Sequence, residues 1–188
     1  MNLYYDAEFT GLRQHTSLIS MALVADDDRA FYAEFSDYDR EQIDDWLRDN
    51  VLAHCRWLTR DDARPGCREK DGLTLCYGDR QQIRAALTQW LSQWERLEIW
   101  ADCPSWDWVL FCELFGGALN IPENIYYLPF DLVTLFKARG LSPDTDREQF
   151  TGLRSSAKQG QRHNALFDAR LLRAACRRLM DQEGQHDN

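Results

Sequence analysis

Alternation of apolar and polar side chains near the N-terminus predicts that the chain begins with β-strands. Over residues 3–9 this alternation places Asp6 and Glu8 on one face and most of the apolar side chains on the other. Further apolar runs follow at 18–24 and 30–35, separated by polar turns. We therefore expect a three-stranded meander whose first strand points two carboxylates the same way.

Helical periodicity appears in the next part of the chain. Apolar residues recur at helical spacing over 40–54 and 80–94, and the second stretch is preceded by Asp79, with Gln82 as its partner in a capping box. Between these helices, the segment 59–78 is rich in charge and contains glycine and proline. It is expected to form a surface excursion or a short hairpin.

Strand and helix alternate in the second half of the chain. The pattern predicts a buried strand at 97–101, a helix over 108–114, a helix near 132–138 and a final helix over 164–180. The segment 142–162 is polar and has no clear periodicity. Strands followed by alternating strands and helices indicate an α/β fold with a mixed sheet and helices on both faces.

Length and composition indicate one globular domain with its own core. The chain has 188 residues, of which 44% are hydrophobic and 28% charged. We expect a single domain over 1–188 whose last residues, 182–188, form a flexible tail. The sequence has no secretion signal and no apolar run long enough for a membrane span, which predicts a cytoplasmic protein without a membrane partner.

The cysteines carry no motif of a metal or redox site. None of them forms a CxxC pair, and in a cytoplasmic protein they are expected to be reduced thiols rather than disulfides or ligands of a zinc cluster. The six cysteines are Cys55, Cys67, Cys76, Cys103, Cys112 and Cys176.

Net charge limits the nucleic-acid partners of the chain. Its 31 acidic and 22 basic residues give a charge of −9, which argues against a broad cationic face that grips long duplexes. A site built from carboxylates and divalent cations can still bind phosphate through the metals. An acidic enzyme with a short, end-on substrate is therefore compatible with this charge.

Two carboxylate clusters have the pattern of ligands for hard cations. Asp6 and Glu8 leave the same face of a strand, which suits oxygen coordination of divalent ions. Asp102 and Asp107 lie where a buried strand gives way to a helix, the usual position of a ligand site in an open α/β sheet. Each cluster alone is also compatible with a solvated strand edge, a turn residue or an acid in the first turn of a helix.

A histidine and a further aspartate stand at the head of the last helix. His163 and Asp168 are five residues apart, so on one continuous helix they would point about 140° apart. A shared site requires His163 to lie in the preceding loop and Asp168 to lie inside the helix. His163 could then take a proton from water near neutral pH, although a surface histidine at a helix start is the more ordinary explanation.

Together these motifs resemble the DEDDh 3′-5′ exonuclease family of the ribonuclease H-like superfamily. The resemblance rests on Asp6-Ala-Glu8-Phe-Thr-Gly-Leu12, the helix with Trp-Asp107, and His163-x4-Asp168, and it spans Tyr5 to Leu172. The opening motif and the block 128–136 are similar to those of oligoribonuclease. The compact, acidic chain is also similar to bacterial and phage 3′-5′ exoribonucleases related to a mycobacterial representative.

The resemblance implies a ribonuclease H-like fold and a role for each motif residue. His163 would be the general base, and Asp6, Glu8, Asp107 and Asp168 would hold two Mg²⁺ or Mn²⁺ ions. The substrate-binding turn would consist of Phe9, Thr10, Gly11 and Leu12. Asp107 fits the second motif better than Asp102, but the residues ahead of it depart from the family pattern, so Asp102 would assist from the outer shell.

The implied substrate is a 3′ end of single-stranded RNA or a 3′ overhang, with single-stranded DNA as an alternative. Hydrolysis would release nucleoside 5′-monophosphates, and related enzymes suggest a homodimer. Two other classes stay open: a catalytically silent nucleic-acid-binding module of the same fold, and an interaction protein whose seven tryptophans line a partner surface. A zinc hydrolase is disfavoured, because the four histidines form no HxH or HxxxH pair.

Overall fold

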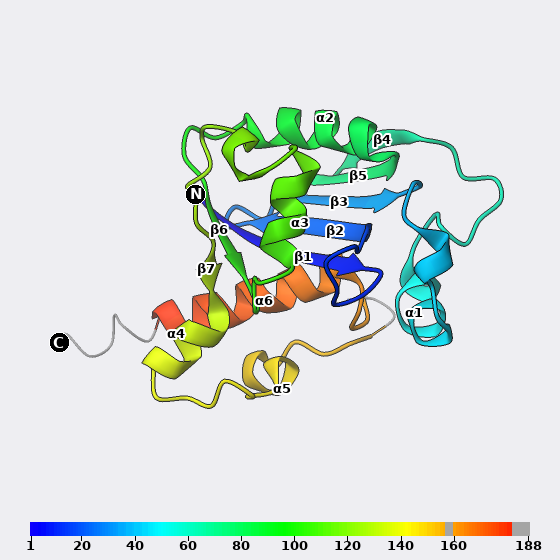
Figure 1. The fold of residues 1–188 in the computed structure, drawn as a ribbon. Helices are drawn as coiled ribbons and strands as arrows, with labels where there is room; N and C mark the ends of the chain where they lie inside the picture. The colour runs from blue at the N-terminus through cyan, green and yellow to red at the C-terminus, as the bar shows by residue number, and fades with distance from the viewer. Residues whose placement is uncertain (157–159, 182–188) are drawn as a thin grey trace.

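A computed structural model describes residues 1–156 and 160–181 and shows a seven-stranded mixed sheet (Figure 1). The strands lie in the order β4-β5-β3-β2-β1-β6-β7. The strands are β1 Asn2–Phe9, β2 Leu18–Ala25, β3 Ala30–Phe35, β4 Gly66–Lys70, β5 Leu73–Gly78, β6 Glu98–Ala101 and β7 Phe130–Asp131. The meander β1-β2-β3 is antiparallel, whereas β6 pairs with β1 in parallel and β5 pairs with β3 in parallel.

Helices cover both faces of this sheet, which confirms the predicted α/β architecture. In Figure 1, α6 runs along the side of the sheet opposite α2 and α3. The α-helices are α1 Asp45–Asn50, α2 Arg80–Leu91, α3 Asp107–Leu114, α4 Leu132–Ala138, α5 Arg147–Thr151 and α6 Ala165–Asp181. Three short 3₁₀ turns are η1 Arg40–Gln42, η2 Leu52–His54 and η3 Ala118–Asn120. None of the described helices is both long and apolar enough to cross a bilayer.

The two faces of β1 pack against different helices, as its alternation predicts. Leu3 and Tyr5 belong to the core that contains residues of α2 and α3. Tyr4 instead packs with Leu132 of α4 and Leu172 of α6. Because side chains alternate along a strand, Asp6 and Glu8 lie on the same face as Tyr4, toward α6.

The prediction of one continuous helix over 40–54 is wrong. The structure has a 3₁₀ turn, the short helix α1 and another 3₁₀ turn in its place. Asp44 has extended backbone and its side chain accepts a hydrogen bond from Leu47 N at 2.8 Å, so a new helix begins at Asp45. The first turn ends at Ile43, and Asp44 caps the helix that follows.

The segment 59–78 forms a hairpin that widens the sheet. Its strands β4 and β5 pair with each other, and β5 also pairs with β3, so that Cys76 is fully buried. Of the two expected alternatives, a surface excursion or a short hairpin, the structure shows the hairpin.

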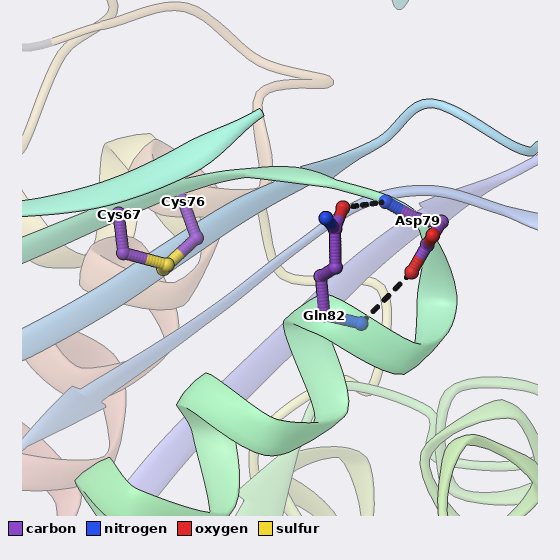
Figure 2. The surroundings of a disulfide bond; sticks show 4 residues. All are labelled: Cys67, Cys76, Asp79 and Gln82. Atoms are coloured by element: carbon purple, nitrogen blue, oxygen red, sulfur yellow. Dashed lines mark hydrogen bonds between the residues drawn. A yellow bond between two sulfur atoms is a disulfide. The ribbon is translucent and has the colours of Figure 1, made fainter. Parts of the chain in front are cut away.

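The predicted capping box of α2 is confirmed as well. Asp79 N donates to Gln82 Oε1 at 3.0 Å, and Gln82 N donates to Asp79 Oδ1 at 2.8 Å (Figure 2).

The expectation that all cysteines are reduced thiols is wrong for one pair. Cys67 and Cys76 form a disulfide between β4 and β5 (Figure 2). The register places the two residues directly opposite each other with a Cα–Cα distance of 4.1 Å. This pairing depends on the strand register, which no cysteine motif reveals. The other four cysteines are free thiols, and the expected tail at 182–188 lies outside the described residues.

Candidate active site

Three carboxylates from two elements meet at the C-terminal end of β1. Asp6 and Glu8 project from this strand toward α6, and Asp168 lies in the first turn of that helix. One carboxylate oxygen of each residue lies within 4.8 Å of the others. The alternation of β1 and the position of α6 against that face are sufficient to bring them together.

Asp107 joins the site from the start of α3. Its Oδ1 accepts a hydrogen bond from the backbone N–H of Ala7 at 3.0 Å, between the two acidic residues of β1. Asp107 is not one of the three residues in the tightest group, but it lines the same cavity.

Asp102 has a different partner. Its two carboxylate oxygens accept hydrogen bonds from Arg147 Nε and Nη2 at 2.8 and 2.9 Å. Arg147 is the first residue of α5, so this ion pair ties the end of β6 to the segment that leads to His163. A bidentate pair of this kind commits the Asp102 carboxylate to a positioning contact.

His163 occupies the position that a shared site requires. It precedes the first residue of α6 and has a left-handed backbone, with φ of 61°. Its backbone N–H donates to Asp168 Oδ2 at 2.7 Å, and its ring meets the Trp46 ring edge to face, with 5.1 Å between centroids. His163 and Asp168 are five residues apart, and the turn before α6 allows both to line the same site, as the sequence analysis required.

These residues line one cavity of about 640 Å³. It contains every residue that the sequence predicted for catalysis, metal binding or the substrate turn, together with polar and aromatic residues that the sequence did not single out for this site. The expected residues are Asp6, Glu8, Phe9, Thr10, Gly11, Leu12, Asp107, His163 and Asp168, and the additional ones include Arg13, Asp44, Trp46, Arg147 and Arg162.

Burial and mutual repulsion make the carboxylates of this cavity hard to ionise. Burial is the largest cause in each case: it raises the pKa of Glu8 to about 8 and the pKa values of Asp107 and Asp168 to about 7. The pKa of Asp6 is raised well above its usual value by burial and then by the charges of Asp168 and Glu8. Asp6 Oδ2 is buried without a hydrogen-bond partner among the described residues. At the centre of this carboxylate cluster, the described residues place no positive charge that would offset the cost of ionisation.

The family of this chain follows from comparison with known proteins. The model of the Rv2179c-like 3′-5′ exoribonuclease domain matches residues 1–180. The chain belongs to this family of 3′-5′ exoribonuclease domains.

Two proteins of Mycobacterium tuberculosis are similar to the chain. The 3′-5′ exoribonuclease Rv2179c of strain ATCC 25618 / H37Rv is 27% identical over 172 residues, which are 90% of this chain and 88% of the relative. The 3′-5′ exoribonuclease MT2234.1 of strain CDC 1551 / Oshkosh matches with the same identity and coverage.

Within this exoribonuclease domain, the histidine of the cavity is held in its neutral form. Its pKa is lowered first by burial and then by the positive charges of Arg162 and His54. Burial therefore disfavours the charged form of the histidine as it does that of the carboxylates, and a neutral imidazole is a competent proton acceptor near pH 7.

Sequence reasoning missed the aromatic and cationic walls of the cavity. Trp46 was expected on the apolar face of a helix, but its side chain is 51% exposed because α1 is short and presents it to the cavity. Arg162 and Arg147 lie in the polar segment where periodicity gives no signal. Only the three-dimensional approach of α1 and α5 to the cavity reveals these residues.

Proposed function

We propose that this protein is a metal-dependent 3′-5′ exoribonuclease that releases nucleoside 5′-monophosphates from single-stranded RNA or 3′ overhangs. One observation carries the proposal: four carboxylates and a histidine line one cavity in a chain that belongs to an exoribonuclease domain family. The two relatives, which are named 3′-5′ exoribonucleases and match most of the chain, support the reaction class.

The donor set of the cavity fits hard divalent cations such as Mg²⁺ or Mn²⁺. Asp6, Glu8, Asp107 and Asp168 offer only carboxylate oxygens, which is the ligand type these ions prefer. The buried, unpartnered Asp6 Oδ2 and the oxygens within 4.8 Å of one another support a role in cation binding. Two bound cations would supply the positive charge that activates water and stabilises the charge developing on a scissile phosphate.

His163 is the general base in this proposal. Burial lowers the pKa of its imidazole, so the ring is neutral at pH 7 and one of its nitrogens can accept the proton of the attacking water. The ring contact with Trp46 and the backbone hydrogen bond to Asp168 hold the residue at the cavity wall. Proton acceptance then requires little reorientation of the side chain.

The terminal nucleotide is proposed to lie between the turn 9–12 and the Trp46 ring. Leu12 is 75% exposed and Trp46 51% exposed, so both can contact a base without regard to its identity. The Thr10 hydroxyl is already engaged, because it donates to Gln42 Oε1 at 2.6 Å. This residue would therefore contribute its backbone to the substrate, and we expect little base specificity.

The test is degradation of 5′-labelled single-stranded RNA and DNA oligomers with Mg²⁺, with Mn²⁺ and with EDTA. The proposal predicts an RNA ladder that shortens from the 3′ end, is absent in EDTA, and is absent for Asp6→Ala and His163→Ala. Asp61→Ala removes an exposed aspartate outside the cavity and serves as the matched control, with activity like wild type. The ratio of RNA to DNA rates measures the sugar preference.

An inactive wild type would contradict the proposal if its melting temperature shows it to be folded and every metal is tried. Wild-type activity in Asp6→Ala would also contradict it, because the cavity would then not be the active site.

Related exoribonucleases also motivate the proposal of a homodimer. Analytical ultracentrifugation would show about twice the 22.1 kDa of one chain. A mass equal to a single chain at micromolar concentration would contradict it.

A further inference from the structure

A second cavity, of about 280 Å³, lies behind the turn that carries His163. It is bounded by β3, by the first half of α6, and by the segment around η2. Its polar lining consists mainly of Tyr32, His54, Arg56, Gln161, Asn164 and Arg170. Within residues 1–156 and 160–181, this lining offers several hydrogen-bond donors and no aspartate or glutamate.

Among the described residues, the two arginines of this cavity have no carboxylate partner. Arg170 is half-buried and Arg56 is exposed, and neither forms an ion pair in the part of the chain that the structure describes. Two other half-buried arginines behave differently: Arg147 pairs with Asp102 at 2.8 Å and Arg173 pairs with Asp28 at 2.7 Å. In a chain with an excess of acidic residues, two neighbouring unpaired guanidinium groups indicate an anion from outside the chain.

The nearby buried carboxylate does not neutralise them. Glu34 is fully buried, and its oxygens accept hydrogen bonds from the Tyr32 hydroxyl at 2.8 Å and from the backbone N–H groups of Trp57 and Leu58 at 2.8 and 3.2 Å. The backbone N–H of Arg56 also donates to Glu34. These contacts use the carboxylate to fix the loop, while the Arg56 side chain lines the cavity.

The cavity shares a wall with the active site. Arg162 and His163 line the active-site cavity, whereas Gln161 and Asn164 line the second one. Asn164 Nδ2 donates to the carbonyl oxygen of His54 at 3.2 Å, which joins the turn to the segment that carries the cationic side chains. A ligand in the second cavity therefore touches the turn that positions His163.

We infer that the cavity lined by His54, Arg56 and Arg170 binds a phosphate group and thereby holds the His163 turn in its active arrangement. Arginine forks match the oxygens of phosphate, and the amides of Gln161 and Asn164 can complete its coordination. The volume suits a phosphate with part of a nucleotide rather than a whole polymer. The phosphate can come from an internal position of the bound RNA strand or from free phosphate in solution.

Binding is tested with inorganic phosphate, by following the melting temperature of the full chain in EDTA. EDTA excludes binding of the anion through divalent cations at the carboxylates, and the arginine variants distinguish the second cavity from the arginines of the first one. At about ten times the dissociation constant, single-site binding predicts a rise of about 3–6 °C over chloride at equal ionic strength. Arg170→Met and Arg56→Gln should each lose most of this rise. Arg84→Met, which removes an exposed arginine of α2, should keep it.

The inference is overturned if phosphate leaves the wild-type melting temperature unchanged, or if both cavity variants respond like wild type. The two variants change different elements, α6 and the loop after η2, so either one that folds is sufficient. Because no nuclease activity is measured, this result is separate from the outcome of the proposed function.

The inference that bound phosphate holds the His163 turn in its active arrangement rests on the proposed function and is tested by kinetics. If the strand supplies the phosphate, Arg170→Met raises KM for a longer RNA about tenfold relative to its effect on a dinucleotide. If free phosphate is the ligand, added phosphate raises the dinucleotide rate of wild type but not of Arg170→Met. Identical kinetics of the two proteins in both experiments would overturn the link.

Discussion

The carboxylates of the active-site cavity hold protons that ordinary surface carboxylates lose, and this property makes the stability of the metal-free protein depend on pH. A raised pKa in the folded state means that folding favours the protonated form, so the penalty is absent below about pH 4 and grows as the pH rises. Burial raises the pKa of Glu8 to about 8 and the pKa values of Asp107 and Asp168 to about 7. In EDTA, the melting temperature should therefore fall between about pH 5 and about pH 8.

Addition of Mn²⁺ should raise the melting temperature most at the alkaline end of this range, where the carboxylates are ionised. Differential scanning fluorimetry over the pH series checks both effects. A melting temperature in EDTA that rises steadily toward pH 8 would contradict the assignment of a buried, repulsive cluster.

Replacement of His163 should remove a proton acceptor and leave the metal ligands in place. We expect His163→Ala to lower kcat by roughly 10²–10⁴-fold, which is the usual contribution of a general base. Because burial lowers the pKa of this histidine, the wild-type rate should fall only as the pH drops below the ordinary histidine value of about 6.5. Rate profiles of both proteins test this. A wild-type profile whose acidic fall survives in the variant would assign the titration to another group.

At the residue scale, alternation and order along the chain were sufficient for part of the site. Asp6 and Glu8 could be placed together because a strand has a period of two, and the requirement that His163 precede its helix followed from helical geometry. The contribution of Trp46 could not be predicted, because its exposure depends on where α1 ends and on what lies opposite. The roles of Asp102 and Asp107 also separate only in space, through Arg147 and Ala7.

At the scale of elements, the Asp102–Arg147 pair fixes α5 and the start of the segment leading to His163. The side chains are 30% and 15% exposed, so removing one partner leaves the other only partly solvated. Asp102→Asn and Arg147→Met should each lower the free energy of unfolding by about 1–3 kcal/mol. Urea unfolding of the two single variants and of the double variant measures their coupling. Purely additive effects would show that the pair does not act as a unit.

Glu34 fixes the loop after η2 through the backbone N–H groups of residues 56–58. In Glu34→Gln, an NH₂ group faces N–H donors, and the free energy of unfolding should fall by about 2–4 kcal/mol. Glu123→Gln, at an exposed position, is the matched control and should be close to neutral. Denaturant titration of both variants tests the prediction, and equal stability of Glu34→Gln and wild type would refute it.

The elements themselves were predictable where the apolar period is regular and less so where polar residues compete with it. The three strands of the meander and helices α2, α4 and α6 lie close to their predicted positions. The interrupted region 40–54 differs because Asp39 and Asp44 cap new turns within an otherwise helical pattern. The disulfide in the β4–β5 hairpin depends on register, which composition and cysteine spacing do not determine.

At the scale of the whole molecule, the chain combines a match to an exoribonuclease domain family over residues 1–180 with a net charge of −9, which argues against a broad cationic surface. In the proposed function, affinity for RNA then depends on the cations of the active site and on a few arginines, rather than on many phosphate contacts. We expect kcat/KM to fall only weakly with monovalent salt, with a slope equivalent to about one to three phosphate contacts. Rates measured over a KCl series at fixed Mg²⁺ test this, and a slope as steep as that of proteins that make six or more phosphate contacts would contradict it.

In the proposed function, this cavity removes nucleotides one at a time from the 3′ end of RNA. Its most direct test is a time course of one RNA oligomer labelled either at its 5′ end or at its 3′ end, with Mg²⁺ and with limiting enzyme. We expect the 3′ label to appear at once as a mononucleotide, while the 5′ label moves through a ladder of successively shorter products. Early release of the 5′ label as a mononucleotide, or internal fragments from both substrates, would contradict it.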